Sequence, residues 1–345
     1  MHKGKLLVTG GLGYIGSHVC VELLDQGFDV TVVDNLSNSK IEVLGRIEFI
    51  CGRRPGFAKL DVCDYAGLRD VFSREKFDAV LHFAGLKAVG ESVRKPILYY
   101  QNNLNSSMTL CQVMEEFGVR KLVFSSSATV YGTASAAPFS ESAPLGPTNP
   151  YGRSKLMVED MLCDLATSDA RWQICLLRYF NPVGAHPKGV LGEDPTGTPN
   201  NLMPYICQVA VGTLKELQVY GKDYPTPDGT GVRDYIHVID LALGHVAALN
   251  HLSDMRGAVP INLGTGRGYS VLEVVEAFQA ASGRKIPFRI VERRPGDIAV
   301  SYANPALAHQ LLGWQAMKGL NDMCADAWRW QERNPQGFMT PFAAR

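Results

Sequence analysis

Short apolar runs alternate with helix-like stretches through the first half of this chain of 345 residues. The pattern predicts strands at residues 6–8, 30–34, 57–60, 79–83, 121–125 and 173–178. Helices are predicted between them, at residues 14–26, 65–74, 99–117 and 150–166. Such short, continuous runs suit strands that are covered on both faces. The expected fold class is therefore α/β, with a doubly wound parallel sheet.

The sequence changes in character near Asn181. Residues 181–201 are rich in Gly, Pro and Asn and predict an ordered loop rather than a helix or a strand. Shorter elements are expected beyond it, at residues 202–213, 217–220, 238–251, 271–280 and 319–331. We therefore expect two domains, residues 1–180 around the parallel sheet and residues 181–345 as a smaller α/β lobe for substrate recognition.

Charge and cysteine usage exclude several kinds of partner. The 34 Lys and Arg residues balance the 34 Asp and Glu residues, so neither nucleic acid nor an anionic membrane surface is expected to bind. The 8 cysteines are scattered without a CxxC pair, which predicts reduced thiols and no metal site. The N-terminus lacks the features of a signal peptide, and no apolar run is long enough to cross a bilayer. These features predict a cytoplasmic protein.

A glycine-rich turn follows the first predicted strand. Gly10, Gly13 and Gly16 form G-x-x-G-x-x-G before the first helix, as close approach to a pyrophosphate requires. Asp34 ends the next strand, where a carboxylate binds the adenosine ribose and repels a 2′-phosphate. The spacing therefore favours NAD over NADP. Asp61 and Val62 follow the third strand and could meet the adenine edge.

The end of the fourth predicted strand is a second candidate part of this site. Residues 83–85 lie where ligand crevices form in open α/β sheets. Lys87 could reach a phosphate or ribose, or could be a solvated loop lysine. His82 is expected to be a partly buried strand histidine rather than a metal ligand.

Tyr151 and Lys155 are the candidate catalytic pair. Their i, i+4 spacing places them on one face of a helix that Asn149-Pro150 would cap. Ser127 ends the strand-like run 121–127 and would orient a substrate hydroxyl. Tyr-x-x-x-Lys alone is weak, because a surface helix can carry it by chance.

The proposed role of Lys155 is to acidify Tyr151. Bringing a tyrosine from a pKa of about 10 to neutrality takes roughly 4 kcal/mol. One charge about 4 Å away supplies a similar amount, and a positive nicotinamide ring would add to it. We therefore expect Lys155 to lower the pKa of Tyr151, making it a general base.

These motifs resemble the extended short-chain dehydrogenase/reductase family and, within it, the UDP-glucose 4-epimerases, over essentially the whole chain. The stretches that carry the resemblance are VTGGLGYIGSH (8–18), HFAGLKAVGES (82–92), SSSATVYG (125–132), LRYFNPVGAHP (177–187), PNNLMPY (199–205) and GTGVRDYIH (229–237). The resemblance implies a Rossmann fold and tightly bound NAD. It implies NAD contacts from Gly10, Gly13, Tyr14, Ile15, Gly16, Asp34, Asn35, Leu36, Ser37, Asn38, Ser39, Asp61, Val62, Phe83, Ala84, Gly85, Leu86, Lys87, Asn102, Ser127, Tyr151, Lys155 and Phe180.

The resemblance also implies a UDP-sugar site and a reaction. Its residues would be Ser127, Tyr151, Asn181, Asn201, Leu202, Gln218, Val219, Tyr220, Arg233, Arg294, Asp297 and Ser301. The implied enzyme interconverts UDP-glucose and UDP-galactose through a 4-keto sugar, as in galactose metabolism. Arg233 and Arg294 would clamp the diphosphate, so that binding energy lies in UDP and the hexose is free to turn.

Two further expectations follow from the resemblance. Ser301 stands where the family has either a bulky or a small residue beside the sugar. A small residue leaves room for an acetamido group, so UDP-GlcNAc and UDP-GalNAc are expected substrates too. Helices 99–117 and 150–166 would form a four-helix interface in a homodimer, although periodicity cannot distinguish that from packing within one subunit.

Other functions on the same fold remain alternatives. A dehydratase needs an acid after the serine-bearing strand, but Ala128 and Thr129 follow Ser127. A UDP-glucuronate enzyme would need further cationic groups, which the sequence does not identify. Another nucleotide-sugar epimerase remains open, as does an NAD-dependent sensor that has lost catalysis.

Overall fold

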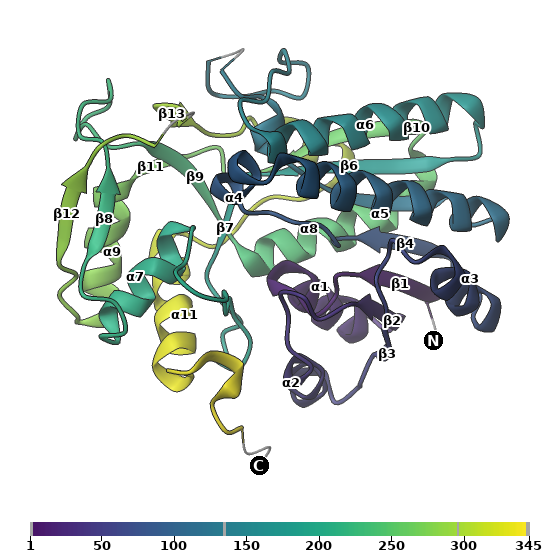
Figure 1. Cartoon of the computed structure of the whole chain (residues 1–345), viewed down its shortest axis with the longest axis horizontal. Coiled ribbons are helices and arrows are strands. Elements are labelled where there is room, and N and C mark those ends of the chain that lie inside the picture. The colour runs from purple at the N-terminus through teal and green to yellow at the C-terminus, as the bar shows by residue number, and fades with distance from the viewer. Residues whose placement is uncertain (1–2, 134–135, 295–296, 343–345) are drawn as a thin grey trace.

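Seven parallel strands form the central sheet of the computed structural model, which describes residues 3–133, 136–294 and 297–342 (Figure 1). The strands run in the order β10-β6-β5-β4-β1-β2-β3. Their bounds are β1 Lys5–Thr9, β2 Asp29–Asp34, β3 Gly56–Lys59, β4 Ala79–His82, β5 Lys121–Ser127, β6 Gln173–Tyr179 and β10 Gly257–Leu263. The order reverses between β1 and β4, and ligands bind outside the carboxyl ends of strands at such a switch point. The predicted fold class is confirmed.

Helices cover both faces of this sheet (Figure 1). One face carries α1 (Tyr14–Asp25), α2 (Glu42–Cys51), α8 (Val238–His251) and α10 (Ala306–Leu312). The other carries α3 (Tyr65–Arg74), α5 (Pro96–Glu116) and α6 (Pro150–Ser168), and the short α4 (Val89–Arg94) packs against α5 and α6.

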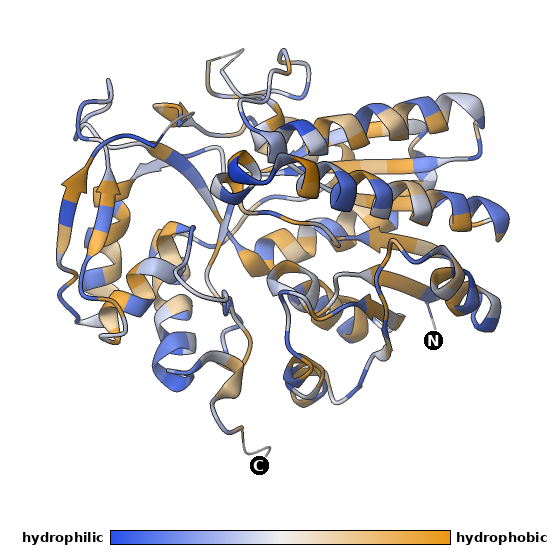
Figure 2. Cartoon of the chain, in the orientation of Figure 1, coloured by the Kyte–Doolittle hydropathy of each residue, from blue (hydrophilic) through white to orange (hydrophobic). Residues whose placement is uncertain are grey.

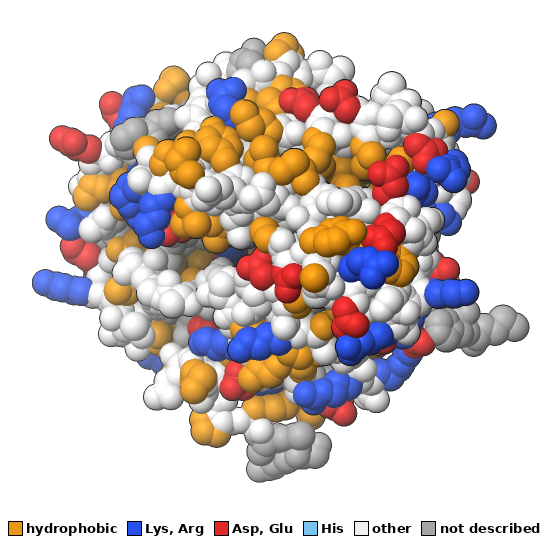
Figure 3. All heavy atoms as spheres, turned by 45° about the vertical axis from the view of Figure 1, so that its right-hand side comes forward, with side chains coloured by type: hydrophobic (Ala, Val, Ile, Leu, Met, Phe, Trp, Pro, Cys, Tyr) orange, Lys and Arg blue, Asp and Glu red, His pale blue; other side chains and the backbone are white. Residues whose placement is uncertain are grey.

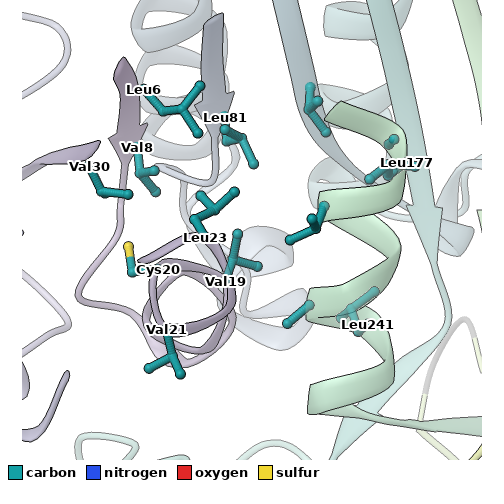
Figure 4. Packing of buried hydrophobic residues seen from close by; sticks show 14 of the residues in the cluster. Leu6, Val8, Val19, Cys20, Val21, Leu23, Val30, Leu81, Leu177 and Leu241 are labelled. Carbon is teal, nitrogen blue, oxygen red and sulfur yellow. The ribbon is translucent and has the colours of Figure 1, made fainter. Parts of the chain in front are cut away.

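The two hydrophobic cores explain why these helices stay on the sheet. Figure 2 shows hydrophobic residues concentrated on the strands and on the helix faces that cover them. In the first core, Val19 and Leu23 of α1 lie near Leu6 and Leu81 of the sheet (Figure 4). Helix α8 packs against α1, and its Leu241 belongs to the same core. Each large side chain buried in this way contributes about 1.5–3 kcal/mol.

The second half of the chain builds a smaller lobe around its own core. A four-stranded sheet contains β7 (Asn181–Val183), β9 (Val232–His237), β11 (Gly268–Ser270) and β13 (Val300–Ser301). A two-stranded sheet contains β8 (Leu217–Tyr220) and β12 (Phe288–Val291). The helices of this lobe are α7 (Leu202–Ala210), α9 (Val271–Ser282) and α11 (Leu320–Arg333).

The six predicted strands of the first half all form, but the prediction for residues 181–201 is partly wrong. Asn181–Val183 is β7, which pairs in parallel with Tyr235–His237 of β9. A three-residue strand containing a proline has no local signal, because it depends on a partner far along the chain. Strand β10 and helix α8, from the second half, complete the first sheet and cover it. The domain boundary at residue 180 stays a prediction.

The described residues contain neither a membrane-spanning helix nor a metal-binding cluster. Among residues 3–133, 136–294 and 297–342, no helix has the length and apolar character needed to span a bilayer. The same residues contain no group of three or more His, Cys, Asp or Glu side chains that could hold a metal ion.

Candidate active site

The glycine turn packs too closely for side chains. Gly10 has a φ of 67°, and a Cβ there would lie 2.7 Å from the backbone nitrogen of Ala84. A Cβ on Gly16 would collide with the carbonyl oxygen of Gly10. Helix α1 begins here with no side-chain cap and no acidic residue in its first turn. Its first amides can therefore bind an anion such as a pyrophosphate.

Asp34 holds the loop that follows β2. Its Oδ1 accepts hydrogen bonds from the Leu36 amide at 3.0 Å and from Ser39 Oγ at 2.7 Å. Its Oδ2 accepts from the amide of Leu12 in the glycine turn at 3.1 Å. The structure thus joins the two parts of the cofactor site predicted from sequence, and the acidic residue lies where an adenosine ribose is expected.

Asp61, predicted to meet the adenine edge, lies beside this loop. Its Oδ2 accepts from Asn35 Nδ2 at 2.9 Å, and its Oδ1 accepts from the Cys63 amide at 2.9 Å. Although burial opposes the charge, these hydrogen bonds keep the pKa of Asp61 below its usual range. Val62 is buried beneath it. This edge of the site therefore keeps a carboxylate that can accept further hydrogen bonds.

The loop after β4 is held by a residue that the sequence did not single out. Asn103 Oδ1 accepts from the Leu86 amide at 2.8 Å, and its Nδ2 donates to Ser154 Oγ on α6 at 3.0 Å. The family resemblance instead implies an NAD contact from the neighbouring Asn102. A signal existed, because Asn103 shares the buried face of α5 with Tyr99 and Leu110. A polar residue in that phase of a helix needs buried partners.

His82 is a buried strand histidine, as predicted. Its Nδ1 lies 2.6 Å from Thr9 Oγ1 and its Nε2 lies 3.0 Å from Ser107 Oγ. Burial lowers its pKa to about 3, so the ring is neutral in the folded protein. It is therefore part of the wall behind the site and not a proton donor to it.

The predicted helix cap of α6 is present and sets the position of Tyr151. The Asn149 side chain accepts from the Gly152 amide at 2.9 Å, and Pro150 occupies the first turn. Lys155, one turn on, is buried, and its Nζ donates to the carbonyl oxygen of Ser125 at 2.7 Å. The same Nζ lies 4.8 Å from the ring centroid of Phe124.

Ser127 meets this helix from the end of β5. Its Oγ accepts from the Thr129 amide at 3.2 Å and from Thr129 Oγ1 at 3.0 Å. With both lone pairs occupied, the serine proton is directed away from Thr129. A hydrogen bond from Ser127 acts to lower the pKa of Tyr151, which is the effect of donation to the phenol oxygen. The structure therefore brings the three predicted catalytic residues together.

The predicted lowering of the Tyr151 pKa by Lys155 is wrong for the residues of the chain itself. Burial raises the pKa of Tyr151, and Ser127 offsets only part of that rise. Burial also lowers the pKa of Lys155 to about 8, against an opposing effect of Glu159. The predicted direction follows from the attraction between the ammonium and the phenolate alone, whereas burial removes water from both groups and opposes the charge on each.

The predicted substrate residues lie in the second lobe. Arg294 stacks on Tyr220 with 3.9 Å between guanidinium carbon and ring centroid, and it donates to the Asn200 carbonyl oxygen at 3.3 Å. Arg233 Nη2 lies 3.6 Å from Asp297 Oδ1. Both arginines thus have neighbours that hold them while leaving donors for a diphosphate.

The other predicted substrate residues fall into three places. Asn181 begins β7 and is exposed, and Asn201 and Leu202 are the cap and first residue of α7. Gln218, Val219 and Tyr220 belong to β8, and Tyr220 Oη donates to Gln218 Oε1 at 2.8 Å. Ser301 pairs with Arg233 in the β13–β9 ladder. Phe180 is buried between β6 and β7.

Glu193 connects the cofactor side to the substrate side, and no sequence motif singles it out. Its Oε1 lies 3.0 Å from Lys87 Nζ and accepts from Asn201 Nδ2 at 3.4 Å. Lys87 follows β4, whereas Asn201 caps α7. One carboxylate therefore links the two lobes across the expected ligand site.

Comparisons with known proteins agree with this geometry. The family model described as the NAD dependent epimerase/dehydratase family matches residues 6–264. A UDP-glucose 4-epimerase of Bacillus subtilis (strain 168) is 58% identical over 333 residues, covering 96% of this chain and 98% of that protein. The UDP-glucose 4-epimerase of Homo sapiens is 54% identical over 343 residues, covering 97% of this chain and 99% of that protein.

Solved structures agree as well. The UDP-glucose 4-epimerase of Bifidobacterium longum in complex with NAD+ and UDP superposes with a TM-score of 0.94 at 55% identity, covering 96% of this chain and 99% of that one. The enzyme of Stenotrophomonas maltophila, with bound NAD and formylated UDP-arabinopyranose, gives a TM-score of 0.93 at 53% identity, covering 95% and 98%. The chain therefore belongs to the NAD dependent epimerase/dehydratase family.

Proposed function

We propose that this chain is an epimerase that holds NAD at the carboxyl edge of its central sheet and interconverts UDP-glucose and UDP-galactose. The observation that carries the proposal is the meeting of Ser127, Tyr151 and Lys155 beside the glycine turn. The relatives and solved structures named above support it, because they are UDP-glucose 4-epimerases and match this chain over nearly their whole length.

The residues present fit NAD. A cradle that a Cβ would fill, a helix N-terminus without an acid and the carboxylate of Asp34 match a pyrophosphate and a ribose. When bound, NAD supplies reversible hydride transfer, so epimerisation needs no net oxidation. The protein supplies position and a proton acceptor.

Tyr151 is the proton acceptor in this proposal. Ser127, already held by Thr129, stabilises the phenolate through its own proton. The Ser125 carbonyl oxygen holds Lys155 Nζ in place. The lysine charge therefore stays close to the N-terminal end of α6, which carries Tyr151. Tyr151 would remove the proton from the hexose 4-hydroxyl and return it after the sugar has turned. Since the sugar must turn, Arg233 and Arg294 would hold UDP instead.

The test is incubation of purified protein with UDP-galactose without added NADH. UDP-glucose should form, and NAD should be released when the protein is denatured with acid. Tyr151→Phe should reduce kcat by at least about 100-fold, the lower range for general acid–base catalysis. Tyr65→Phe is the matched control, because Tyr65 is exposed on α3 and its hydroxyl donates to Glu116. Full activity of Tyr151→Phe would refute the mechanism.

Dehydratase activity is less well supported. The 3-10 turn after Ser127 consists of Ala128–Val130, and none of these side chains can protonate a leaving hydroxyl. An inactive sensor is also disfavoured, because Tyr151 and Lys155 are both present and lie with Ser127 at the end of β5. Loss of water from the substrate, or binding without turnover, would favour these alternatives.

Acetylated UDP-hexoses are proposed as additional substrates. Ser301 is nearly buried on β13, directly beside Arg233, and is small. Ser301→Tyr should abolish turnover of UDP-GlcNAc while UDP-glucose turnover stays within about twofold, since only the acetamido group meets the added ring. Equal loss of both activities would argue against a steric gate at this position.

The chain is also proposed to act in the cytoplasm and as a homodimer. All eight cysteines are free, which suits a reducing compartment. The dimer proposal rests on the outward face of α5, where exposed positions from Ile97 to Gln112 carry no charge.

A further inference from the structure

A row of polar side chains lies buried behind the catalytic residues. Ser126 of β5, Arg178 of β6 and Asn262 of β10 are direct register partners across three strands. Their exposed fractions are 1%, 3% and 0%. Because register partners point to the same side of a sheet, the three side chains leave it together. A buried guanidinium in this row requires a partner.

Glu159 of α6 is that partner. Arg178 donates to the Glu159 carboxylate from Nη2 at 2.6 Å and from Nε at 3.0 Å. Ser126 Oγ donates to the same carboxylate. Although burial disfavours the cation, its hydrogen bonds with Glu159 raise the pKa of Arg178. Arg178 therefore keeps its charge inside the protein.

Tyr131 and Asn262 extend this network. Arg178 Nη1 donates to Tyr131 Oη at 3.2 Å, and Tyr131 Oη donates to Asn262 Oδ1 at 2.6 Å. Asn262 Nδ2 donates to the Phe139 carbonyl oxygen at 2.8 Å. A buried polar network in which each of these atoms has a partner favours one arrangement of the elements that contribute to it.

The network contacts both elements that carry the catalytic residues. Ser126 stands between Ser125, whose carbonyl oxygen holds Lys155, and Ser127. Glu159 lies one helical turn beyond Lys155 on α6. The Glu159–Ser126 bond therefore fastens the helix that carries Tyr151 to the strand that carries Ser127.

Stability alone does not explain an ion pair at this place. Replacing a buried pair by apolar residues of similar volume is often neutral or stabilising, because both ions lose their hydration. A buried ion pair that stabilises the fold little can still position the elements around it and influence the charge of neighbouring groups. Its location directly behind the catalytic residues gives it both uses.

The groups that face Lys155 show what Glu159 adds. Tyr151 and Glu159 approach from α6, the Ser125 carbonyl and the Phe124 ring from β5, and the neutral His82 from β4. Of these, Glu159 carries a negative charge. It opposes the effect of burial, which lowers the pKa of Lys155 to about 8.

We propose that Glu159, held by Arg178, is a positioning residue for the reaction: it fixes α6 on β5 and keeps the Lys155 ammonium charged. This inference rests on the proposed epimerase function. Arg178 and Ser126 act through Glu159, and none of the three touches the substrate.

Glu159→Gln is the first test, with Asp160→Asn as its control on the neighbouring, exposed residue of α6. Glu159→Gln should lower kcat about tenfold with KM within about twofold, because positioning is lost after binding. The alkaline limb of kcat should move to lower pH by about one unit, since the charge that opposes burial is gone. Asp160→Asn should behave as wild type. An unshifted alkaline limb in Glu159→Gln would overturn the proposal.

Two further variants separate position from folding. Glu159→Leu/Arg178→Met removes both charges, so it should keep a thermal midpoint close to wild type yet retain the low kcat and the shifted limb. Wild-type kcat and pH profile in this double variant would show that the network only holds the fold. Ser126→Ala removes one hydrogen bond and should fold, with kcat reduced about threefold. An unchanged kcat there would overturn the role of Ser126.

A readout without turnover separates this inference from the proposed function. The Lys155 Cε resonance of protein carrying ¹³C-labelled lysine, identified by its absence in Lys155→Met, reports the protonation of that amine directly. Its titration midpoint should be lower in Glu159→Gln than in wild type, and equal midpoints would overturn the inference. A lower midpoint in a protein that epimerises no sugar would instead refute only the proposed function.

Discussion

His82 ties the stability of the central sheet to pH. Both ring nitrogens are bonded inside the protein, and burial, with a smaller effect of Lys155, lowers its pKa to about 3. In the unfolded chain the pKa of histidine is about 6.5. Between these values the unfolded chain binds a proton that the folded protein does not, so the free energy of unfolding falls as pH decreases from about 6.5.

Urea unfolding at about pH 7 and about pH 5 measures this effect. His82→Asn should lose less stability than wild type over that interval, because asparagine does not titrate. His251→Asn, which changes a partly exposed histidine at the end of α8, should lose as much as wild type. The same loss of stability in wild type and His82→Asn would mean that His82 is not the group that titrates.

At this scale the sequence identified residues better than it identified their electrostatics. Ser127, Tyr151 and Lys155 could be found because each stands at the boundary of a predictable strand or helix. The pKa of Tyr151 had the wrong predicted direction, because desolvation depends on everything packed around the phenol. Glu193 and Asn103 were missed because their partners are distant in sequence.

At the scale of elements, the turn between β1 and α1 is the least tolerant of a side chain. In Gly16→Ala the new Cβ would meet the backbone of Gly10 and Gly11, which cannot move aside. Overpacking of this kind costs about 1–3 kcal/mol. The variant should therefore have a lower thermal midpoint and should retain less NAD after gel filtration.

Gly45→Ala in α2 is the matched control. A Cβ on Gly45 would have no atom within 4 Å, and an alanine in a helix interior is more stable by about 0.5–1 kcal/mol. Its thermal midpoint should rise slightly and its NAD content should not change. A Gly16→Ala protein with the stability and NAD content of wild type would show that the turn can widen.

Elements with local signals were predictable, and elements defined by distant partners were not. The strands of the first half appear as apolar runs bounded by turns, and the cap of α6 as Asn-Pro. By contrast, Gly257, Pro260 and Asn262 interrupt the sequence of β10. It becomes a strand because β6 offers a free parallel edge along its whole length, from Gln173 to Tyr179.

At the scale of the whole molecule, α5 presents an outward face that carries no charge from Ile97 to Gln112, before the exposed Glu115 and Glu116 at the end of the helix. Exposed positions recur along it at Ile97, Gln101, Asn105, Met108 and Gln112. In Figure 3 the right-hand side of the view in Figure 1 comes forward. A band of hydrophobic side chains crosses the upper half of this face. α5 also packs on α6 within the subunit, and Met157 of α6 is exposed. An uncharged face on paired helices suits a two-fold contact between two copies of the chain.

Sedimentation velocity tests this contact. Wild type should sediment as twice the chain mass of 37.7 kDa, whereas Ile97→Glu should sediment as a monomer. Ile97 is 66% exposed in the single chain, so the substitution spares the fold, yet a two-fold axis would bury two like charges near each other. Phe288→Glu is the control, because Phe288 is 43% exposed on β12 of the other lobe. This variant should remain dimeric. A dimer that survives Ile97→Glu but dissociates with Phe288→Glu would place the contact on the second lobe.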